Sequence, residues 1–430
     1  MSRAPNSQID ARRTAVALLR GVLERREQLS EVLKGDGLLL RLSPGDRARA
    51  QRLAMTTLRH LRRADTMLGQ FVEKLPPSEA LTILRLAVVE ICVEGEAPHG
   101  VVDSAVTLMR ATGKSRRMGG MANAVLRQVA TEGPALWDDL EPAILPKWLR
   151  RRMIHMYKEP AVEAIEAAHT QGAPLDVTVK ADAALWAEKL NGELLPTGSI
   201  RLHRNVQVTE LPGFDTGDWW VQDAAAAVAV QILAPQPEET ILDLCAAPGG
   251  KTMQLAASGA QVTALDQSKE RLSRVAENLE RTKLNAELIQ ADALDWDAPQ
   301  KFDAIVLDAP CSATGTIRRH PDLPYVKTGQ DLDQLFELQA GLLEAAYDML
   351  KPGGRMVFCT CSLLAEEGEL QIKRARQRLG FEVTDIPFET LGLDPQWSAR
   401  DDTGVRLRPD YWAERGGMDG FFITLLRKPK

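Results

Sequence analysis

The chain has 430 residues, of which 44% are hydrophobic and 26% are charged, and its formal net charge is −6. These values are ordinary for a soluble globular protein, and the length suffices for two or three domains with full cores. No stretch has the apolar core of a signal peptide or the length of a membrane span, so we expect no membrane partner.

The chain contains five cysteines, an odd number that argues against a disulfide framework. Cys245, Cys311 and Cys361 lie inside apparent site motifs, which favours reduced thiols and a cytoplasmic protein. No set of Cys and His residues has the spacing of a zinc site, so we expect no metal.

Residues 8 to about 133 place apolar side chains at helical spacing and contain no alternating run of strand length. Ser43 and Pro44 are typical of a helix start, with an N-cap followed by proline in the first turn. We therefore expect an all-helical domain at 1–140, which could bind RNA, bind a protein partner or be structural.

The helical domain is basic although the whole chain is acidic. Residues 1–140 hold 21 Lys and Arg against 16 Asp and Glu, a net charge of +5, which leaves −11 for the remainder. Any one basic cluster is better explained as a solvated helix face, but several together make a phosphate-tracking surface plausible. These clusters stand at 59–63, 116–117, 150–152 and 318–320.

Residues 141–225 are predicted to form a mixed linker subdomain. A connecting helix is expected within 142–157, followed by short strands at 175–179, 199–202 and 207–211. The adjacent Trp219 and Trp220 could stack bases, or could equally form a hydrophobic lid or domain contact.

From residue 226 onward the sequence predicts an α/β domain, because short apolar runs alternate with helical patterns. The expected fold is a doubly wound, Rossmann-like, seven-stranded mixed sheet whose last strand is inserted antiparallel. Strands are predicted at 240–244, 261–265, 286–290, 303–307, 354–360, 381–386 and 420–426, with helices at 252–257, 268–282, 333–350 and 364–379.

The turn after the first of these strands is the most informative stretch. A strand, a turn of small residues and a helix are how α/β proteins hold a nucleotide-like ligand. A P-loop would need Gly where Cys245 stands, so S-adenosylmethionine (SAM) is the better ligand, with Asp266 about 20 residues on for its ribose. The turn consists of Cys245, Ala246, Ala247, Pro248, Gly249, Gly250 and Lys251.

Each proposed strand end presents a carboxylate or a thiol. Asp292 suits the adenine amino group or an adjacent water, and Asp308 is followed by a Pro-Cys pair that includes Cys311. Cys361 follows a further strand. Two thiols and a carboxylate beside a methyl donor suggest chemistry on a base, although buried free cysteines are more often structural.

That chemistry would be methylation of cytosine at carbon 5, which is a poor nucleophile by itself. A thiolate added to carbon 6 makes carbon 5 able to take a methyl group from a sulfonium, after which a base removes the carbon-5 proton and the thiolate leaves. Cys311, Cys361 and Asp308 fit this requirement, and residue types alone do not rank the two cysteines.

Five motifs stand out in the sequence: DLCAAPGGKT at 243–252, DAPCS at 308–312, RRHPD at 318–322, TCS at 360–362 and MDGFF at 418–422. Together they resemble the Sun family of RNA (cytosine-5) methyltransferases. The helical region, with Val125-Leu126-Arg127 in its last predicted helix, is similar to the NusB-like domain of the branch acting on bacterial small-subunit ribosomal RNA, the RsmB type. The resemblance covers nearly the whole chain.

The resemblance implies specific roles. Cys361, in the TCS motif, would be the nucleophile, and Cys311 would assist product release. SAM contacts would come from the turn 245–251 and from Asp266, Asp292 and Asp308. The substrate would be 16S ribosomal RNA, with a tRNA cytosine methyltransferase or a non-catalytic RNA-binding protein on the same fold as alternatives, and a monomer is expected.

One element departs from the family pattern. Where the family reads Leu-Arg-Val-Asn after a proline, this chain places Thr178 and Lys180 at the Arg and Asn positions. The RNA contact of that element is therefore expected to differ, so target choice is less firmly implied than the chemistry.

Overall fold

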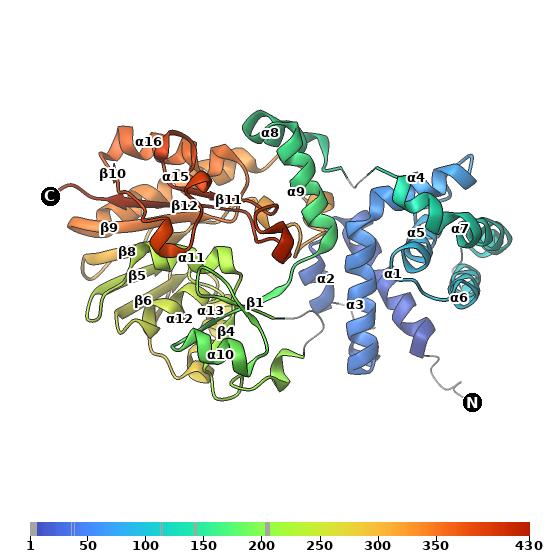
Figure 1. Ribbon diagram of the computed structural model, residues 1–430, viewed down its shortest axis with the longest axis horizontal. Helices are drawn as coiled ribbons and strands as arrows, with labels where there is room; N and C mark the ends of the chain where they lie inside the picture. Colours follow the sequence, from blue (N-terminus) through green and yellow to red (C-terminus); the bar gives the residue numbers. More distant parts are fainter. Residues whose placement is uncertain are drawn as a thin grey trace. The chain divides into compact units, whose positions relative to one another are not determined.

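A computed structural model describes residues 7–35, 37, 39–111, 113, 115–141, 144–202 and 207–430. The chain packs into two compact units (Figure 1). The helical unit comprises Met1–Ile154, Glu159–Gly172 and Ile317–Gly329, and the sheet unit comprises His155–Lys158, Ala173–Thr316 and Gln330–Lys430. The three-part division expected at 140 and 225 stays a prediction.

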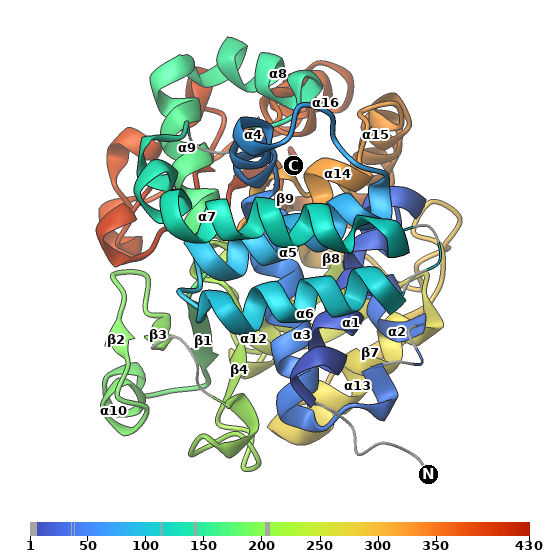
Figure 2. The same ribbon diagram turned by 90° about the vertical axis from the view of Figure 1, so that its right-hand side faces the viewer.

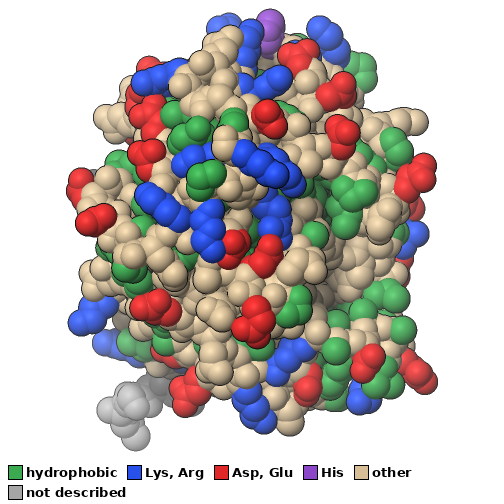
Figure 3. All heavy atoms as spheres, turned by 90° about the vertical axis from the view of Figure 1, so that its left-hand side faces the viewer, with side chains coloured by type: hydrophobic (Ala, Val, Ile, Leu, Met, Phe, Trp, Pro, Cys, Tyr) green, Lys and Arg blue, Asp and Glu red, His purple; other side chains and the backbone are tan. Residues whose placement is uncertain are grey.

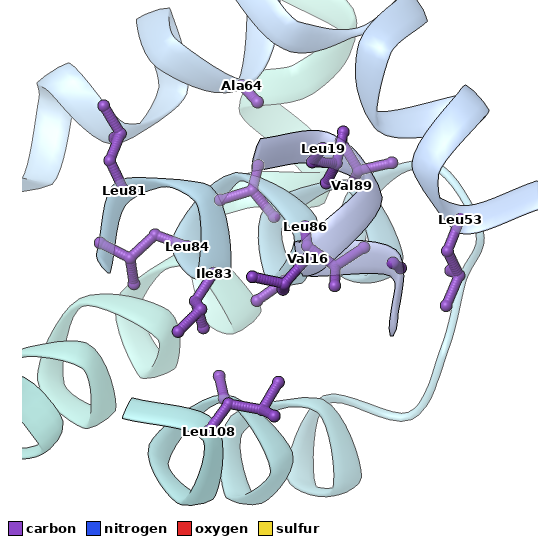
Figure 4. Close-up of a cluster of buried hydrophobic side chains, with 14 of the residues drawn as sticks. Val16, Leu19, Leu53, Ala64, Leu81, Ile83, Leu84, Leu86, Val89 and Leu108 are labelled. Carbon is purple, nitrogen blue, oxygen red and sulfur yellow. The ribbon is translucent and has the colours of Figure 1, made fainter. Parts of the chain in front are cut away.

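The helical unit is a bundle built around α5 (Ser78–Cys92), whose apolar side chains are buried on nearly all sides. Ser43 caps α3 by accepting the N–H of Asp46, with proline at the first position, as predicted. Figure 2 shows α5, α6 and α7 running side by side, and Figure 4 shows part of the core. The other helices are α1 Ser7–Arg25, α2 Leu29–Gly35, α3 Pro44–Arg59, α4 Leu61–Phe71, α6 Pro98–Ala111, α7 Gly119–Asp139, α8 Lys147–Tyr157 and α9 Glu159–Gln171.

A distant stretch of sequence completes this bundle. We call Ile317–Gly329, which carries α14 (Leu323–Val326), the strap. Asp322 accepts the N–H of Leu29 at 2.9 Å, and the Tyr325 hydroxyl donates to the Leu58 carbonyl at 3.0 Å. Tyr325 also packs against the helical core. The strap therefore belongs to the helical unit although it follows Cys311 closely in the sequence.

Several arginines of the predicted basic clusters have partners inside the helical unit. Arg59 donates to the Arg318 carbonyl at 3.1 Å, and Arg63 lies over the Trp137 ring. Arg150 pairs with Glu166 at 3.1 Å, and Arg318 is fully buried. These four guanidiniums stabilise the fold, so the clusters offer less free positive surface than the sequence suggests.

The main sheet of the sheet unit has the strand order β10-β12-β9-β8-β5-β6-β7. Strands β5 to β9 are parallel to one another, and β12 is antiparallel to β9, as predicted. The strands are β5 Thr240–Leu244, β6 Gln261–Asp266, β7 Glu287–Gln290, β8 Phe302–Asp308, β9 Leu350–Thr360, β10 Glu382–Val383, β11 Val405–Leu407 and β12 Phe421–Arg427.

All seven predicted strands are present, and the sheet has one strand more, eight among the described residues. The additional strand, β11, is three residues long and pairs only with β12. It was missed because so short a run has no detectable period, and its central residue is Arg406, a buried cation paired with Glu369.

Helices cover both faces of the main sheet, because successive strand residues point to opposite sides. Ile241 packs with α11 and α12, whereas its neighbour Leu242 packs in the cluster that contains α15 and α16 (Figure 1). These helices are α11 Ala224–Leu233, α12 Gly250–Ala257, α13 Lys269–Thr282, α15 Leu332–Met349 and α16 Glu369–Leu379. No helix in the described part of the chain is both long and apolar enough to cross a membrane.

Charges of both signs are interspersed on the face drawn in Figure 3. In the sheet unit, Lys351 pairs with Asp303 and Arg355 pairs with Glu239, each at 2.7 Å. The face in Figure 3 is therefore not the uniformly basic surface that tracking a phosphate backbone would require.

A second, four-stranded sheet has the order β2-β3-β1-β4. The prediction of a strand at 207–211 was wrong, since Val208–Glu210 is a 3₁₀ turn. Trp219 and Trp220 lie on β4 and are buried, so neither ring can stack on a base. Of the two alternatives, the structure supports a hydrophobic packing role. The elements are β1 Leu175–Val179, β2 Glu193–Leu194, β3 Ile200–Leu202, β4 Trp219–Val221 and α10 Ala183–Lys189.

A buried ion pair joins two strands of this small sheet. Arg201 donates two hydrogen bonds to Asp176, at 2.7 and 2.8 Å, and both side chains are buried. We expect Asp176→Ala to lower the free energy of unfolding of the sheet unit by about 3–5 kcal/mol, because Arg201 would keep a buried charge without its partner. Urea titration against the exposed control Asp215→Ala measures this, and equal midpoints for the two variants would contradict it.

Candidate active site

The candidate residues converge because parallel strands end at one edge of the sheet. Asp308 ends β8 directly opposite Cys359 of β9, so the loops that follow these neighbouring strands start side by side. Cys311 lies three residues beyond Asp308, and Cys361 two beyond Cys359. The sheet alone thus brings both predicted cysteines to one place.

The two thiols are in contact, with 3.4 Å between Cys311 Sγ and Cys361 Sγ. The Gly315 N–H donates to the Cys361 carbonyl at 3.0 Å, which ties the two loops together through the backbone. The hydrogen bond with Cys361, together with burial, raises the pKa of the Cys311 thiol well above its ordinary value. Cys311 therefore stays protonated and can donate a hydrogen bond to a thiolate at Cys361.

Asp308 and Lys251 form an ion pair at the same edge, with Lys251 Nζ 2.7 Å from Asp308 Oδ2. Burial disfavours the charged ammonium, but the carboxylates of Asp308 and Asp243 outweigh burial and raise the pKa of Lys251. The thiol of Cys359 lies 3.6 Å from the other oxygen of Asp308. Lys251, predicted as a cofactor contact, is thus also joined to the predicted catalytic carboxylate.

The turn after β5 has a shape that a small ligand could approach closely. Cys245 has a φ of 60° and Gly249 a φ of 101°, both in the left-handed region. A Cβ at Gly249 would lie 3.1 Å from Val275 Cγ1, so the turn packs closely against α13. Burial raises the pKa of the Cys245 thiol to about 12, so this cysteine is not a candidate nucleophile.

The residues that would serve a P-loop are already used inside the protein. Lys251 pairs with Asp308, and the buried Thr252 hydroxyl donates to Asp243 Oδ2 at 2.6 Å. Neither side chain is therefore available for a phosphate or a magnesium ion. The geometry favours a ligand without phosphates at this turn.

Asp266 and Asp292 differ in their surroundings. Asp266 is buried and accepts the N–H groups of Ala247 at 3.2 Å and Ser268 at 2.9 Å, so it holds the turn in place. Asp292 is exposed and accepts the N–H of Leu294 at 3.0 Å. Within the described part of the chain, no hydrogen bond joins Asp292 to the other candidate residues.

Sequence reasoning missed a buried polar cluster behind the two thiols. Glu367, which is fully buried, accepts hydrogen bonds from Ser312, Ser362 and Gln339. One signal was available, since a serine directly follows each of the two cysteines. The glutamate itself has no such signal, because it lies five residues beyond Ser362 among other acidic residues.

Comparison with known proteins identifies the family. The ribosomal RNA small subunit methyltransferase B of Citrobacter koseri is 35% identical over 97% of this chain and 98% of its own length. The protein of the same name from Xanthomonas campestris is 36% identical over 90% of both chains. Residues 230–427 match the family described as 16S rRNA methyltransferase RsmB/F. The chain belongs to this family.

Membership of the RsmB/F family makes the chain an RNA methyltransferase, and residues 9–131 also match the NusB family. The crystal structure of PH0851 superposes with a TM-score of 0.73 at 22% identity, covering 99% of this chain and all of that chain, which shows the shared fold. A methyltransferase homologue from Pyrococcus horikoshii gives a TM-score of 0.56 at 29% identity over 66% of this chain and 95% of its own.

Asp243, the first residue of the motif at 243–252, should give the protein an unusual pH dependence of stability. Burial raises its pKa to about 7, although the hydrogen bond from Thr252 and the charge of Lys251 act to lower it. Between pH 4 and 7 the folded protein keeps a proton that the unfolded chain loses, so this group lowers stability as the pH rises through that window. Below pH 4 both states are protonated and the contribution vanishes.

We therefore expect Asp243→Asn to flatten this pH dependence and to raise the free energy of unfolding at pH 8 by roughly 1–3 kcal/mol. The variant keeps an oxygen that can accept from Thr252 and removes the buried charge. Urea midpoints of both proteins at pH 5 and pH 8 measure the effect. Parallel pH profiles would show that Asp243 does not cause it.

Proposed function

We propose that this RNA methyltransferase forms 5-methylcytosine in 16S ribosomal RNA, using SAM as methyl donor and Cys361 as covalent nucleophile. The observation that carries the proposal is the pair of thiols 3.4 Å apart beside the Asp308–Lys251 ion pair. A binding protein on this fold would need neither the thiol contact nor the buried ion pair. The substrate follows from the names of the relatives in Citrobacter koseri and Xanthomonas campestris.

The turn at 245–251 fits SAM. Cys245 and Gly249 give the turn its left-handed backbone. Asp243 Oδ1, at the start of the motif, is buried without a hydrogen-bond partner, as expected where a ligand supplies one. We propose that the turn, Asp266 and Asp292 hold the cofactor, which supplies an electrophilic methyl group. Asp308, through its ion pair, orients Lys251 toward the reacting base.

In the proposed reaction the Cys361 thiolate adds to carbon 6 of cytosine, and the electron pair of the carbon 5–carbon 6 double bond moves into the ring. Donors beside the ring collect the developing charge, and we assign this role to Lys251, which pairs with Asp308 at the same edge of the sheet. Carbon 5 then takes the methyl group, and a base removes its proton. The electron pair of that carbon–hydrogen bond re-forms the double bond, and Cys361 leaves carbon 6 as a thiolate. Cys311, held protonated, lies close enough to Cys361 to assist this release.

We place the reaction in the cytosol, where ribosomal RNA is present and Cys361 stays reduced, as the mechanism requires. RNA binding is assigned to the helical unit together with the small sheet. Thr178 and Lys180 lie on or beside β1 of that sheet, so the departure from the family pattern falls within this region.

The test is methyl transfer from labelled SAM to protein-free 16S RNA, with tRNA as a parallel substrate and nucleoside analysis of the product. We expect label in 5-methylcytidine from 16S RNA only. Label in tRNA alone would move the substrate to tRNA. The absence of 5-methylcytidine from every RNA offered, including small ribosomal particles, would overturn the proposed function.

A further inference from the structure

We propose that Glu367 is the positioning residue that fixes the distance between the two thiols. The inference rests on the proposed function for its catalytic consequence, but the geometry stands by itself. Glu367 is fully buried and follows Cys361 by six residues, within the 3₁₀ turn Ala365–Glu367. Its side chain reaches across to the other cysteine loop.

All four acceptor positions of the Glu367 carboxylate are filled by donors. Oε1 accepts from the Ser312 N–H at 2.8 Å and from Gln339 Nε2 at 3.0 Å. Oε2 accepts from the hydroxyls of Ser312 and Ser362, each at 2.5 Å. Three of these four hydrogen bonds come from Ser312 and Ser362, so the carboxyl group joins both cysteine loops.

The partners of Glu367 are the residues directly after the thiols. Ser312 follows Cys311, and Ser362 follows Cys361 in the sequence. The Glu367 carboxylate therefore accepts hydrogen bonds from the residue next to each cysteine. Gln339, on α15, also donates to the Pro310 carbonyl at 2.9 Å, which fixes the residue before Cys311. Both cysteine loops are therefore held by hydrogen bonds to the same buried carboxylate.

A second buried pair supports the same anchor. Arg406 of β11 donates to the Ser362 carbonyl at 2.5 Å and pairs with Glu369. The guanidinium thus holds the backbone of the Cys361 loop at Ser362, the residue whose hydroxyl donates to Glu367.

The identity of the residue matters because glutamine would carry donors of its own. In Glu367→Gln the new NH₂ group faces either the Ser312 N–H and Gln339, which then lose their acceptor, or the two serine hydroxyls, which must then turn to accept from it and lose their short hydrogen bonds to Oε2. The loops then relax, and the sulfurs separate. A displacement of about 1 Å at reacting groups can cost roughly 10²-fold in rate.

Disulfide formation measures the distance between the sulfurs without any methyl transfer. Diamide takes one proton and one electron from each thiol and becomes the hydrazine, while the sulfurs of Cys311 and Cys361 form one sulfur–sulfur bond. Both residues are partly exposed, so the reagent can reach them. Mass spectrometry of digested protein identifies the pair against Cys92, Cys245 and Cys359.

We expect Glu367→Gln to form the Cys311–Cys361 disulfide at least tenfold more slowly than the parent and to lower kcat about 10²-fold, with SAM affinity unchanged. Glu367→Asp, which keeps the carboxylate, should recover part of both losses. The matched control is Glu337→Gln on α15, an exposed carboxylate paired with Arg374, which should behave as the parent. Parental disulfide and methyl-transfer rates in Glu367→Gln would overturn the proposal.

If Glu367→Gln does not fold, the double variant Ser312→Ala/Ser362→Ala decides, because it removes both hydroxyl donors and keeps the carboxylate. Slower disulfide formation in that variant supports the anchor, and an unchanged rate refutes it. One further outcome separates the two proposals. If the parent methylates no RNA but the variants still form the disulfide more slowly than the parent, the proposed function is wrong and the positioning role of Glu367 is supported.

Discussion

Replacing Cys361 with serine is expected to abolish methyl transfer, with a loss of at least about 10⁴-fold in rate. The hydroxyl of serine is a far weaker acid than a thiol, and the hydrogen bond that Cys311 can donate at 3.4 Å does not suffice to make it a nucleophile. The measurement is single-turnover transfer of labelled methyl groups to 16S RNA.

The control for this prediction is Cys92→Ser in the helical unit, where burial raises the pKa of the thiol to about 11 and no site residue is near in sequence. This variant should keep the parental rate. SAM affinity, measured by calorimetry, should be the same in Cys361→Ser and the parent. Full activity in Cys361→Ser would reject the nucleophile assignment, and Cys311 would become the candidate.

Replacing Cys311 with serine is expected to trap the enzyme on its substrate. If Cys311 assists the step that releases Cys361 from carbon 6, its loss leaves the sulfur–carbon bond intact. A covalent protein–RNA complex should then accumulate in Cys311→Ser when SAM and 16S RNA are present, and turnover should fall by roughly 10²–10⁴-fold, the usual range for general acid–base assistance.

Denaturing gel electrophoresis with labelled RNA detects this complex, which should withstand boiling in detergent. The double variant Cys311→Ser/Cys361→Ser is the control, and it should form no complex. A complex that persists in the double variant would show that another residue is the nucleophile. Normal turnover in Cys311→Ser would remove Cys311 from the reaction and leave it a structural thiol.

Much of the sheet unit follows from local sequence patterns. The apolar runs at β5, β6, β8 and β9 are long enough to predict buried strands, and a parallel sheet then places Asp308, Cys311 and Cys361 at one edge. The register of β8 and β9, with Asp308 opposite Cys359, starts the two cysteine loops side by side. The 3.4 Å contact between the thiols also depends on how the loops are held beyond the strands, and the strand pattern does not predict it.

Other features depend on contacts between distant residues and have no local pattern. Glu367 looks like any acidic residue before a helix, and its burial is set by two loops that meet only in the fold. From sequence alone, Trp219 and Trp220 resemble a platform for stacking bases. In the structure their strand pairs with β1, and both rings are buried. Arg318, in a basic cluster, is buried because the strap joins the helical unit.

The strap also constrains how the protein is made. Tyr325 and Val326 pack against the helical core, yet they are synthesised about 150 residues after Gly172, the last residue of the helical unit before the strap. At ordinary translation speeds of about 5–20 residues per second, the strap is synthesised roughly 7–30 s after the rest of the helical unit. During that interval the first strands of the sheet emerge from the ribosome, so the two units must mature together rather than in turn. An amino-terminal fragment made alone would end as an incomplete bundle, and chaperone contact is expected there first.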